Sequence, residues 1–368
     1  MPHLVAIDLP GGDQFVEVLR RIWAAGDAAF PLDQRLPGAA RRAVLSAIAP
    51  DQLINEQGLH TLDGHSVDEG DALVVATSGT TGSPRGVVLT HDAVAASARA
   101  TSARLGVAGD DTWLACLPLA HVGGLSVITR AIVTTTPVVV HDGFDVDAVE
   151  GAARQGATLV SLVPTALRRL DASLFRRIVL GGSRPPDELP ANVVATYGMT
   201  ETGSGVVYDG YPLDGVELRV DTTGEIHVRC PMLLRCYRDG TNPVVDGWFA
   251  TGDLGELADD GRLVVHGRRG DLIISGGENV WPVTVEDVLR AHPRIDHVAV
   301  AGVADVEWGQ RVVAWIVATD ASNPPTLSSI RSFGAETLPM YMMPKEIRLV
   351  DSLPTTSSGK VRRQDLPS

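Results

Sequence analysis

Residues 72–91 read ALVVATSGTTGSPRGVVLTH, and this stretch decides the fold. The run at 72–78 predicts a buried β-strand, and VVLTH at 87–91 predicts a second one. Between them, glycines let backbone N–H groups approach an anion closely, and hydroxyl groups and a guanidinium add donors and charge. The strand–loop–strand pattern therefore predicts a polyphosphate-binding loop made of Thr77, Ser78, Gly79, Thr80, Thr81, Gly82 and Arg85.

This loop is not of the Walker type. The GxxxxGK[ST] pattern is absent, and Pro84 opposes the helix that would have to follow such a loop. An ordinary turn rich in serine, threonine and glycine is the alternative, but hairpin loops rarely need so many hydroxyl groups.

Outward from the loop, short apolar runs alternate with helical patterns as far as about residue 200. This alternation predicts βαβ units and a largely parallel sheet with helices on its faces. Asp92 is the expected cap of the first helix. The further strands are expected at 112–119, 137–140, 158–163, 175–180 and 193–196, and the further helices at 124–133, 145–155 and 165–170.

The pattern changes beyond residue 205. Short strands at 216–220, 225–230 and 262–267 are separated by Asp/Gly turns, which predicts a small antiparallel region. Helical and strand patterns then mix over about 100 residues. We therefore expect an α/β protein with a large N-terminal domain over 1–267 and a smaller α+β domain over 268–368, with the boundary near Arg268–Asp271.

Composition narrows the function classes. The net charge of −14 with no basic tail argues against nucleic-acid binding, which needs clustered Lys and Arg. No apolar run reaches roughly 18 residues, so no membrane span is predicted. The N-terminus lacks a basic region followed by an apolar run, so no signal peptide is predicted and a cytoplasmic location is expected. Cys116, Cys230 and Cys236 lie in no metal-binding spacing and are expected to be reduced thiols.

The motif TSGTTGSPRGVVLTH resembles the phosphate-loop signature of the adenylate-forming superfamily, which includes acyl-CoA synthetases, peptide-synthetase adenylation domains and firefly luciferase. The family usually has Lys at the position of Arg85. The resemblance implies an enzyme that adenylates a carboxylic acid with ATP and then makes a thioester with a thiol such as that of CoA.

Further motifs resemble those of the same family and follow in order. LPLAHVGGL at 117–125 would lie beside the acyl pocket, with His121 as its gate. GGS at 181–183 would pack against adenine through Gly182 and Ser183. TYGMTET at 196–202 would supply Tyr197 and Gly198 for adenine, Thr200 for a phosphate oxygen and Glu201 as the Mg²⁺ ligand.

The last motifs span the expected domain boundary. The resemblance implies that Asp253 binds the ribose hydroxyls and that Arg268 contacts ribose or phosphate. Gly270 would be the hinge of a mobile C-terminal domain. SGGEN at 275–279 would place Gly276 and Gly277 beside CoA, and Lys360 would be the mobile catalytic lysine. The resemblance covers residues 72–363, and the N-terminal subdomain is expected to be trimmed.

Residues 196–220 resemble the short o-succinylbenzoate–CoA ligases of high-GC actinobacteria, which serve menaquinone synthesis. That acid carries a second carboxylate, for which the candidates by location are Arg130, Arg168, Arg169 and Arg184. The alternatives are a CoA ligase for another aryl or short acyl acid, a stand-alone adenylation enzyme that loads a carrier protein, and an inactive ATP-binding regulator. The expected partners are the small acid, ATP and CoA, with a homodimer left open.

Overall fold

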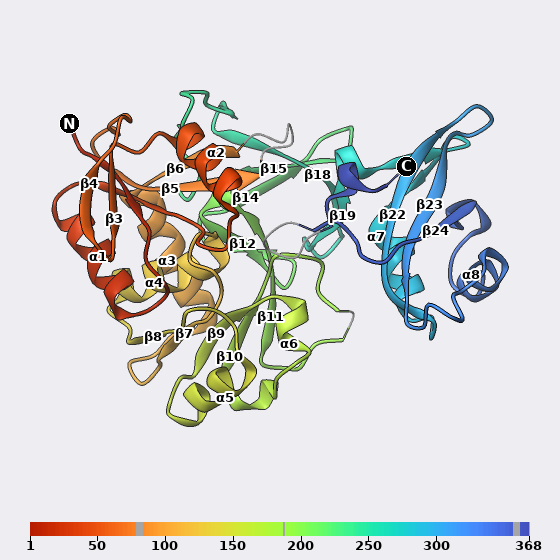
Figure 1. Ribbon diagram of the computed structural model, residues 1–368, viewed down its shortest axis with the longest axis horizontal. Coiled ribbons are helices and arrows are strands. Elements are labelled where there is room, and N and C mark those ends of the chain that lie inside the picture. Colours follow the sequence, from red (N-terminus) through yellow and green to blue (C-terminus); the bar gives the residue numbers. More distant parts are fainter. Residues whose placement is uncertain (79–83, 187, 356–360, 368) are drawn as a thin grey trace. The chain divides into compact units, whose positions relative to one another are not determined.

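The computed structural model describes residues 1–78, 84–186, 188–355 and 361–367 (Figure 1). Contacts divide the chain into two units. The large unit comprises Met1–Arg219, His227–Ala250 and Asp259–Leu263. The small unit comprises Val220–Ile226, Thr251–Ala258 and Val264–Ser368. The fold is mixed α/β, as predicted. No helix in the described part of the chain is long and apolar enough to span a membrane.

The first sheet of the large unit has the strand order β16-β6-β5-β2-β1-β3-β4. Its strands are β1 (Leu4–Ile7), β2 (Ala28–Pro31), β3 (Gln52–Asn55), β4 (Gly58–Thr61), β5 (Asp71–Ser78), β6 (Pro84–Thr90) and β16 (Cys236–Tyr237). β5 and β6 are antiparallel, with Thr77 opposite Arg85, so the predicted strand–loop–strand arrangement is confirmed. The first 70 residues, for which the sequence predicted no structure, form four of these strands and the helices α1 (Asp13–Ala24) and α2 (Gly38–Ile48).

The second sheet has the order β13-β12-β11-β10-β9-β7-β8. Its strands are β7 (Trp113–Ala115), β8 (Val138–Val140), β9 (Leu159–Leu162), β10 (Arg177–Leu180), β11 (Val193–Met199), β12 (Ser204–Tyr208) and β13 (Tyr211–Pro212). Strands β7 to β11 pair in parallel, as the βαβ pattern predicted, whereas β12 and β13 add as antiparallel strands.

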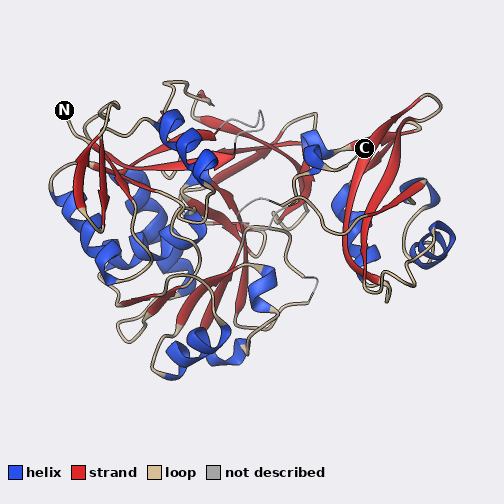
Figure 2. Cartoon of the chain, in the orientation of Figure 1, coloured by secondary structure: helices blue, strands red, loops and turns tan. Residues whose placement is uncertain are grey.

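Two helices, α3 (His91–Leu105) and α4 (Val122–Thr134), pack against each other (Figure 2). α3 contacts β5 and β6 of the first sheet and β12 of the second, and α4 contacts strands of the second sheet. Both helices are almost entirely buried along their inner faces. On the second sheet, α5 (Val146–Arg154) buries Val149 and Ala152 in a cluster with residues of β9 and β10. The layers hold the C-terminal ends of the parallel strands in fixed positions, because each layer is anchored by apolar burial.

Strand β16 reaches the first sheet from far along the chain. Tyr237 lies opposite Val87 on β6, and the Arg238 amide donates to the Gly86 carbonyl at 2.7 Å. The Arg238 guanidinium donates to the carbonyl oxygens of Ile48 and Ser66, 190 and 172 residues earlier in the sequence. This edge of the sheet is therefore closed by contacts of very long sequence separation.

A third sheet has the order β14-β15-β18-β17, with β19 also paired to β18. Its strands are β14 (Glu217–Val220), β15 (Glu225–Arg229), β17 (Val244–Val245), β18 (Trp248–Leu257) and β19 (Leu263–Arg268). They include the three short strands that the Asp/Gly turns predicted.

The small unit has its own sheet, in the order β21-β20-β23-β22 with β24 paired to β23. Its elements are β20 (Ile273–Ser275), β21 (Glu278–Val280), α7 (Pro282–Arg290), β22 (Ile295–Asp305), β23 (Gly309–Ala318), α8 (Leu327–Gly334) and β24 (Glu346–Leu349). Residues of α7, α8 and the strands share one apolar core. The α+β character expected beyond residue 268 is present.

Three sequence-based boundaries were wrong. Asp92 does not cap α3: the helix begins at His91, two residues before the expected start, and the Thr90 hydroxyl accepts the hydrogen bond from the Ala93 amide at 3.1 Å. The strand expected over 112–119 ends at Ala115, because the chain turns where the His121 amide donates to the Pro118 carbonyl. The helix expected over 165–170 is a single turn, α6 (Pro164–Leu167), which begins at a proline.

Candidate active site

Several predicted site residues follow the C-terminal ends of parallel strands of the second sheet. His121 follows β7, Gly182 and Ser183 follow β10, and Glu201 follows β11. Because parallel strands end at the same edge of a sheet, these residues lie along one edge, where open α/β sheets bind their ligands. The Thr196 hydroxyl donates to the Leu180 carbonyl at 3.0 Å and ties β11 to β10 at that edge.

The motif at 196–202 is held by two elements, the end of β11 and a short helical turn. β11 continues to Met199, so Tyr197 and Gly198 are strand residues paired with β12 across an irregular register. A Cβ at Gly198 would lie 2.2 Å from the Ser204 carbonyl oxygen, so a larger residue does not fit. Thr200 and Glu201 then form the one-turn 3₁₀ helix η2 (Thr200–Thr202), which presents a half-buried Glu201.

Tyr237, which sequence reasoning missed, connects Glu201 with the base of the phosphate loop. Its hydroxyl donates to Glu201 Oε1 at 3.0 Å, and the Arg85 guanidinium carbon lies 3.6 Å from the centre of its ring. Burial, with Glu201 next, raises the pKa of Tyr237 to about 12, so the hydroxyl stays protonated and can donate. The predicted metal ligand and the predicted loop cation thus contact the same tyrosine, one at its hydroxyl group and the other at a face of its ring.

The phosphate loop itself, from Gly79 to Gly82, lies outside the described residues together with Thr80 and Thr81. At its base, the Thr77 hydroxyl donates to the Arg85 carbonyl at 3.4 Å. Arg85 Nη2 donates to Thr241 at 2.8 Å and to Asp239 at 3.2 Å. Arg85 is therefore held by its own chain, and its role toward ATP stays a prediction, as does that of Ser78.

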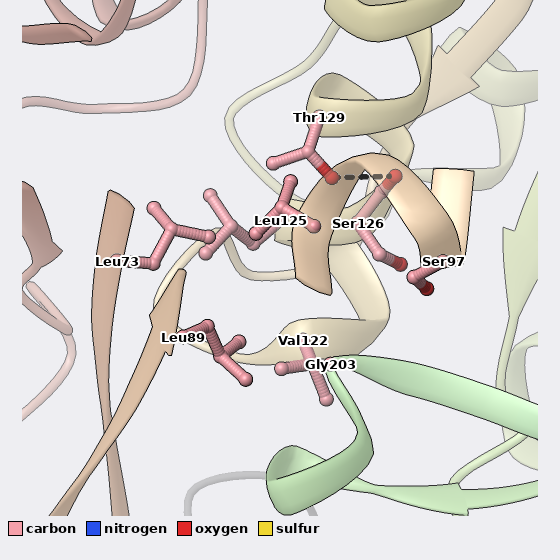
Figure 3. A pocket seen from close by; sticks show the side chains of 9 residues that line it. Leu73, Leu89, Ser97, Val122, Leu125, Ser126, Thr129 and Gly203 are labelled. Carbon is pink, nitrogen blue, oxygen red and sulfur yellow. Dashed lines mark hydrogen bonds between the residues drawn. The ribbon is translucent and has the colours of Figure 1, made fainter. Parts of the chain in front are cut away.

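His121 occupies the N-cap position of α4, and its carbonyl accepts from the amides of Gly124 and Leu125. The next residues on this helix line a small cavity between α4, α3 and the β5–β6 hairpin (Figure 3). The cavity wall is apolar, apart from the hydroxyl groups of Ser97, Ser126 and Thr129. The predicted acyl-pocket motif thus begins the helix that forms this wall.

Of the four candidate arginines, one is buried. Arg130 is 1% exposed, and its Nη2 donates to Ser126 at 2.9 Å and to Ser204 at 2.7 Å. Its Nε has no hydrogen-bond partner among the described residues, and no carboxylate there pairs with it. In contrast, Arg168, Arg169 and Arg184 are exposed. The guanidinium carbon of Arg130 also lies 5.3 Å from the centre of the Trp113 ring. A buried cation without a paired carboxylate is unusual, because burial of a charge without a counter-charge is costly.

The small unit brings two predicted ribose residues together. Asp253 is buried, and its Oδ1 lies 2.8 Å from Arg268 Nε. Arg268 also donates to the Thr251 carbonyl at 3.1 Å. The pair is formed across β18 and β19, so the strand pairing sets its position. Half of the Arg268 side chain remains exposed and within reach of a ligand.

The remaining predicted residues of the small unit are distributed over two turns. Gly270 lies in the one-turn η3 (Arg269–Asp271), where its φ is outside the left-handed region, so this conformation does not itself require glycine. Gly276 and Gly277 have φ of 63° and 85°, which glycine accommodates readily. The Trp308 ring packs directly over Gly276, and Lys345 Nζ lies 3.7 Å from the centre of that ring.

Lys360 lies outside the described residues, but the chain directly after it is anchored. Arg363 Nη2 donates to the buried Glu286 at 2.7 Å, and its other nitrogens donate to Asp271 and to the Val300 carbonyl. Arg363 was not predicted as a functional residue. Its sequence signal is only that it follows the lysine by three positions.

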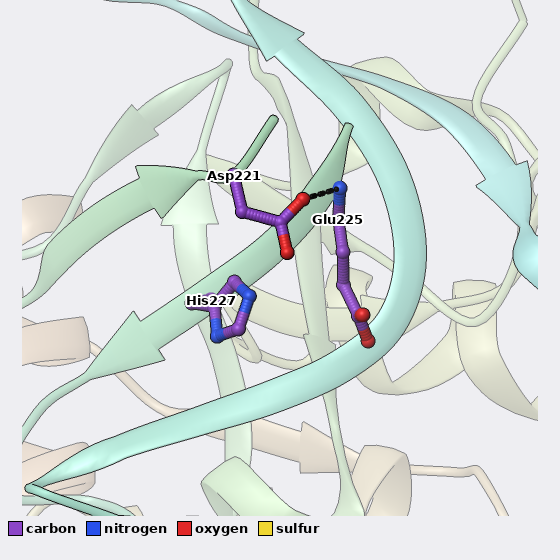
Figure 4. Close-up of side chains that lie close together, drawn as sticks. All are labelled: Asp221, Glu225 and His227. Carbon is purple, nitrogen blue, oxygen red and sulfur yellow. Dashed lines mark hydrogen bonds between the residues drawn. The ribbon is translucent and has the colours of Figure 1, made fainter. Parts of the chain in front are cut away.

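On the β14–β15 hairpin, Asp221, Glu225 and His227 place possible ligand atoms within 4.8 Å of one another (Figure 4). Asp221 accepts hydrogen bonds from the amides of Thr223 and Glu225, and Glu225 pairs with Arg269 at 2.8 Å. Hydrogen bonds within the turn therefore satisfy the Asp221 carboxylate, and the ion pair with Arg269 satisfies that of Glu225.

Comparisons with known proteins give consistent matches. The family model for AMP-binding enzymes matches residues 62–238, and the model for the C-terminal domain of AMP-binding enzymes matches residues 284–360. The probable 2-succinylbenzoate–CoA ligase of Mycobacterium tuberculosis is 42% identical over 333 residues, which cover 82% of this chain and 85% of that protein.

Solved structures of o-succinylbenzoate coenzyme A synthetase from Bacillus subtilis are also similar. The complex with the acyl-adenylate intermediate has a TM-score of 0.89 at 28% identity, covering 100% of this chain and 88% of the other. The complex with ATP and a magnesium ion has a TM-score of 0.88 at 29% identity, covering 99% and 89%.

Proposed function

Because the chain belongs to the family of AMP-binding enzymes, we propose that it is an ATP-dependent acid–CoA ligase that acts on 2-succinylbenzoate through an acyl-adenylate. The observation that carries the choice of acid is the 42% identity to the mycobacterial ligase over most of both chains. The Tyr237 link between Glu201 and Arg85 supports a polyphosphate site at the edge of the second sheet.

In the first half-reaction, a carboxylate oxygen of the acid attacks the α-phosphorus of ATP, and the bond to pyrophosphate breaks. Two anions must approach each other, so cationic groups and N–H donors are needed where charge develops. We assign this role to the loop at 77–82 and to Lys360. Glu201 would hold Mg²⁺, which neutralises phosphate charge when bound. A half-buried carboxylate with one oxygen held by Tyr237 fits a hard cation.

In the second half-reaction, the CoA sulfur attacks the acyl carbonyl carbon. The bond between that carbon and the phosphate oxygen of AMP breaks, and AMP leaves with its electron pair. Asp253 and Arg268 would hold the ribose of the nucleotide, and adenine would lie against Tyr197, Gly198, Gly182 and Ser183. We assign the turn at Gly276 and Gly277 to CoA, since an exposed ring and an ammonium group lie beside it. Gly270 would be the hinge between the two half-reactions.

Arg130 is the best of the four candidates for the second carboxylate of the acid. It is buried beside the wall of the α4 cavity, where its partners are hydroxyl groups and the Trp113 ring. A ligand carboxylate would supply the counter-charge that the described residues do not provide. Arg168, Arg169 and Arg184 are exposed, so they need no such partner.

The test is acid-dependent pyrophosphate release from Mg-ATP, with and without CoA, across a panel of acids that includes 2-succinylbenzoate and benzoate. Release with 2-succinylbenzoate and formation of its CoA thioester, identified by mass, would support the proposal. Release with other acids alone would keep the reaction and refute the substrate. Adenylation without any effect of CoA would favour loading of a carrier protein, and no release with any acid would favour a regulator.

A further inference from the structure

We propose that Asp33 and Arg35 are positioning residues that hold His121 as a neutral hydrogen-bond acceptor at the acid-binding site. This inference rests on the proposed function, because His121 begins the acyl-pocket helix. Both residues precede the segment matched by the family model, which starts at residue 62. They lie in a loop after β2 to which the sequence assigned no role.

The three side chains form a short chain of contacts. Arg35 Nε and Nη2 each donate to one oxygen of Asp33, both at 2.8 Å. Arg35 Nη2 lies 3.2 Å from His121 Nε2, while Asp33 Oδ2 lies 3.6 Å from the same nitrogen. The side chain of Asp33 is 8% exposed, so the bidentate pair has little freedom to move. The guanidinium therefore reaches His121 from an anchored position.

The loop that carries the pair is itself fixed. The Leu32 amide donates to the Ile7 carbonyl at 3.0 Å, and the Leu36 amide donates to the Asp33 carbonyl at 3.3 Å. Burial opposes ionisation of Asp33, but hydrogen bonds from Arg35 outweigh it and keep the pKa of Asp33 below its usual value. The ionised form of Asp33 is thus favoured, and it orients Arg35.

The contact decides which nitrogen of His121 carries the proton. A guanidinium has only N–H donors, so the imidazole nitrogen that it touches must accept. A protonated Nε2 would set two donors against each other at 3.2 Å. The geometry therefore assigns the neutral tautomer with the proton on Nδ1, since the tautomer of a histidine is set by its hydrogen-bond partners.

The consequence concerns the acid. The residue after His121, Val122, lines the α4 cavity, so we expect the orientation of the His121 ring to affect binding of the acid beside this helix. Removal of the Arg35 donor would remove this contact with Nε2 and favour the other tautomer. We expect this to weaken productive binding of the acid while ATP binding, which uses other strand ends, is unaffected.

The first experiment reads the tautomer directly. Protein labelled with ¹⁵N-histidine is measured at pH 8 by a long-range ¹H–¹⁵N correlation, with the His121 signals identified by their loss in His121→Gln. We expect the pattern of a proton on Nδ1 in the wild type, and a shift toward a proton on Nε2 in Arg35→Ala. Arg35→Lys keeps a donor and the charge beside Asp33 and should restore the wild-type pattern. An unchanged pattern in Arg35→Ala would overturn the inference.

The second experiment is kinetic. Acid-dependent pyrophosphate release by Arg35→Ala should show a KM for the acid raised about tenfold, with the KM for ATP within about twofold of the wild type. The matched control is Arg41→Ala, which removes an ion pair with Asp8 in the same N-terminal segment and should leave both constants unchanged. Equal rises in both KM values would mean a general loss of structure and would refute the positioning role.

The two proposals fail in different ways. If the wild type does not activate 2-succinylbenzoate, the proposed function falls, but the tautomer of His121 can still be measured. If the wild type is active and the tautomer is insensitive to Arg35, only the present inference falls.

Discussion

Replacing Arg363 by alanine should detach the chain that follows Lys360 from the core of the small unit. The side chain of Glu286 is only 3% exposed and that of Arg363 is 18% exposed, so the variant leaves a buried carboxylate without its closest cation. Removal of one partner of a buried pair costs about 3–5 kcal/mol. In the variant, Glu286 still accepts hydrogen bonds from the Val300 amide at 2.8 Å and from Arg290 at 3.3 Å. We therefore expect a loss of stability at the lower end of this range, about 3 kcal/mol.

Hydrogen exchange followed by mass spectrometry measures this locally. A loss of about 3 kcal/mol corresponds to about a hundredfold faster exchange of peptides that contain α7 and the Val300 amide. The neighbouring Arg362 is a matched control, because it forms an exposed pair with Asp365. Arg362→Ala should cost about 0.5 kcal/mol or less and leave exchange in α7 almost unchanged.

The same two variants test function. Arg363→Ala should slow acid-dependent pyrophosphate release strongly, because Lys360 loses the fixed point three residues after it, whereas Arg362→Ala should not. Equal effects of the two variants on exchange or on pyrophosphate release would refute the reasoning that the buried pair anchors the tail.

Three other substitutions probe the proposed site. Lys360→Ala should abolish adenylation yet spare thioester formation from supplied acyl-adenylate; equal loss of both half-reactions, measured separately, would contradict its role. Tyr237→Phe removes the hydrogen bond to Glu201 and should weaken Mg²⁺ binding to the ATP complex about tenfold, measured by calorimetry. An unchanged Mg²⁺ affinity would show that the Tyr237 hydroxyl does not orient Glu201. Arg130→Met should raise the KM for 2-succinylbenzoate at least tenfold but not that for benzoate, if benzoate is accepted. Equal changes for both acids would indicate a purely structural role.

Much of the large unit was predictable from local patterns. The strands predicted at 158–163 and 175–180 contain short, largely apolar stretches, LVSL at 159–162 and IVL at 178–180, so their burial could be predicted from the local pattern. The motif at 196–202 predicted roles for Gly198 and Glu201. Because the motif directly follows the strand predicted at 193–196, both residues were also expected near the end of that strand.

What the sequence could not supply were partners from distant parts of the chain. Tyr237 contacts Glu201 only because β16 pairs with β6, and nothing in the dipeptide Cys236–Tyr237 indicates a strand. Arg35 likewise meets His121 across 86 positions. The prediction of the α3 N-cap was wrong for a local reason. Thr90 and Asp92 are both good N-cap residues, and which of them caps the helix depends on where β6 ends.

During synthesis, the first sheet cannot close until residue 238 has left the ribosome. Before then, the edge of β6 that β16 will cover has no strand beside it, and Arg238 is not yet present to hold the carbonyl oxygens of Ile48 and Ser66. An open strand edge favours pairing with other chains, so the nascent protein passes through a period of aggregation risk. The base of the phosphate loop lies on this same strand. A nucleotide bound at the proposed loop can therefore stabilise the newly made chain only after residues 236–238 have been synthesised.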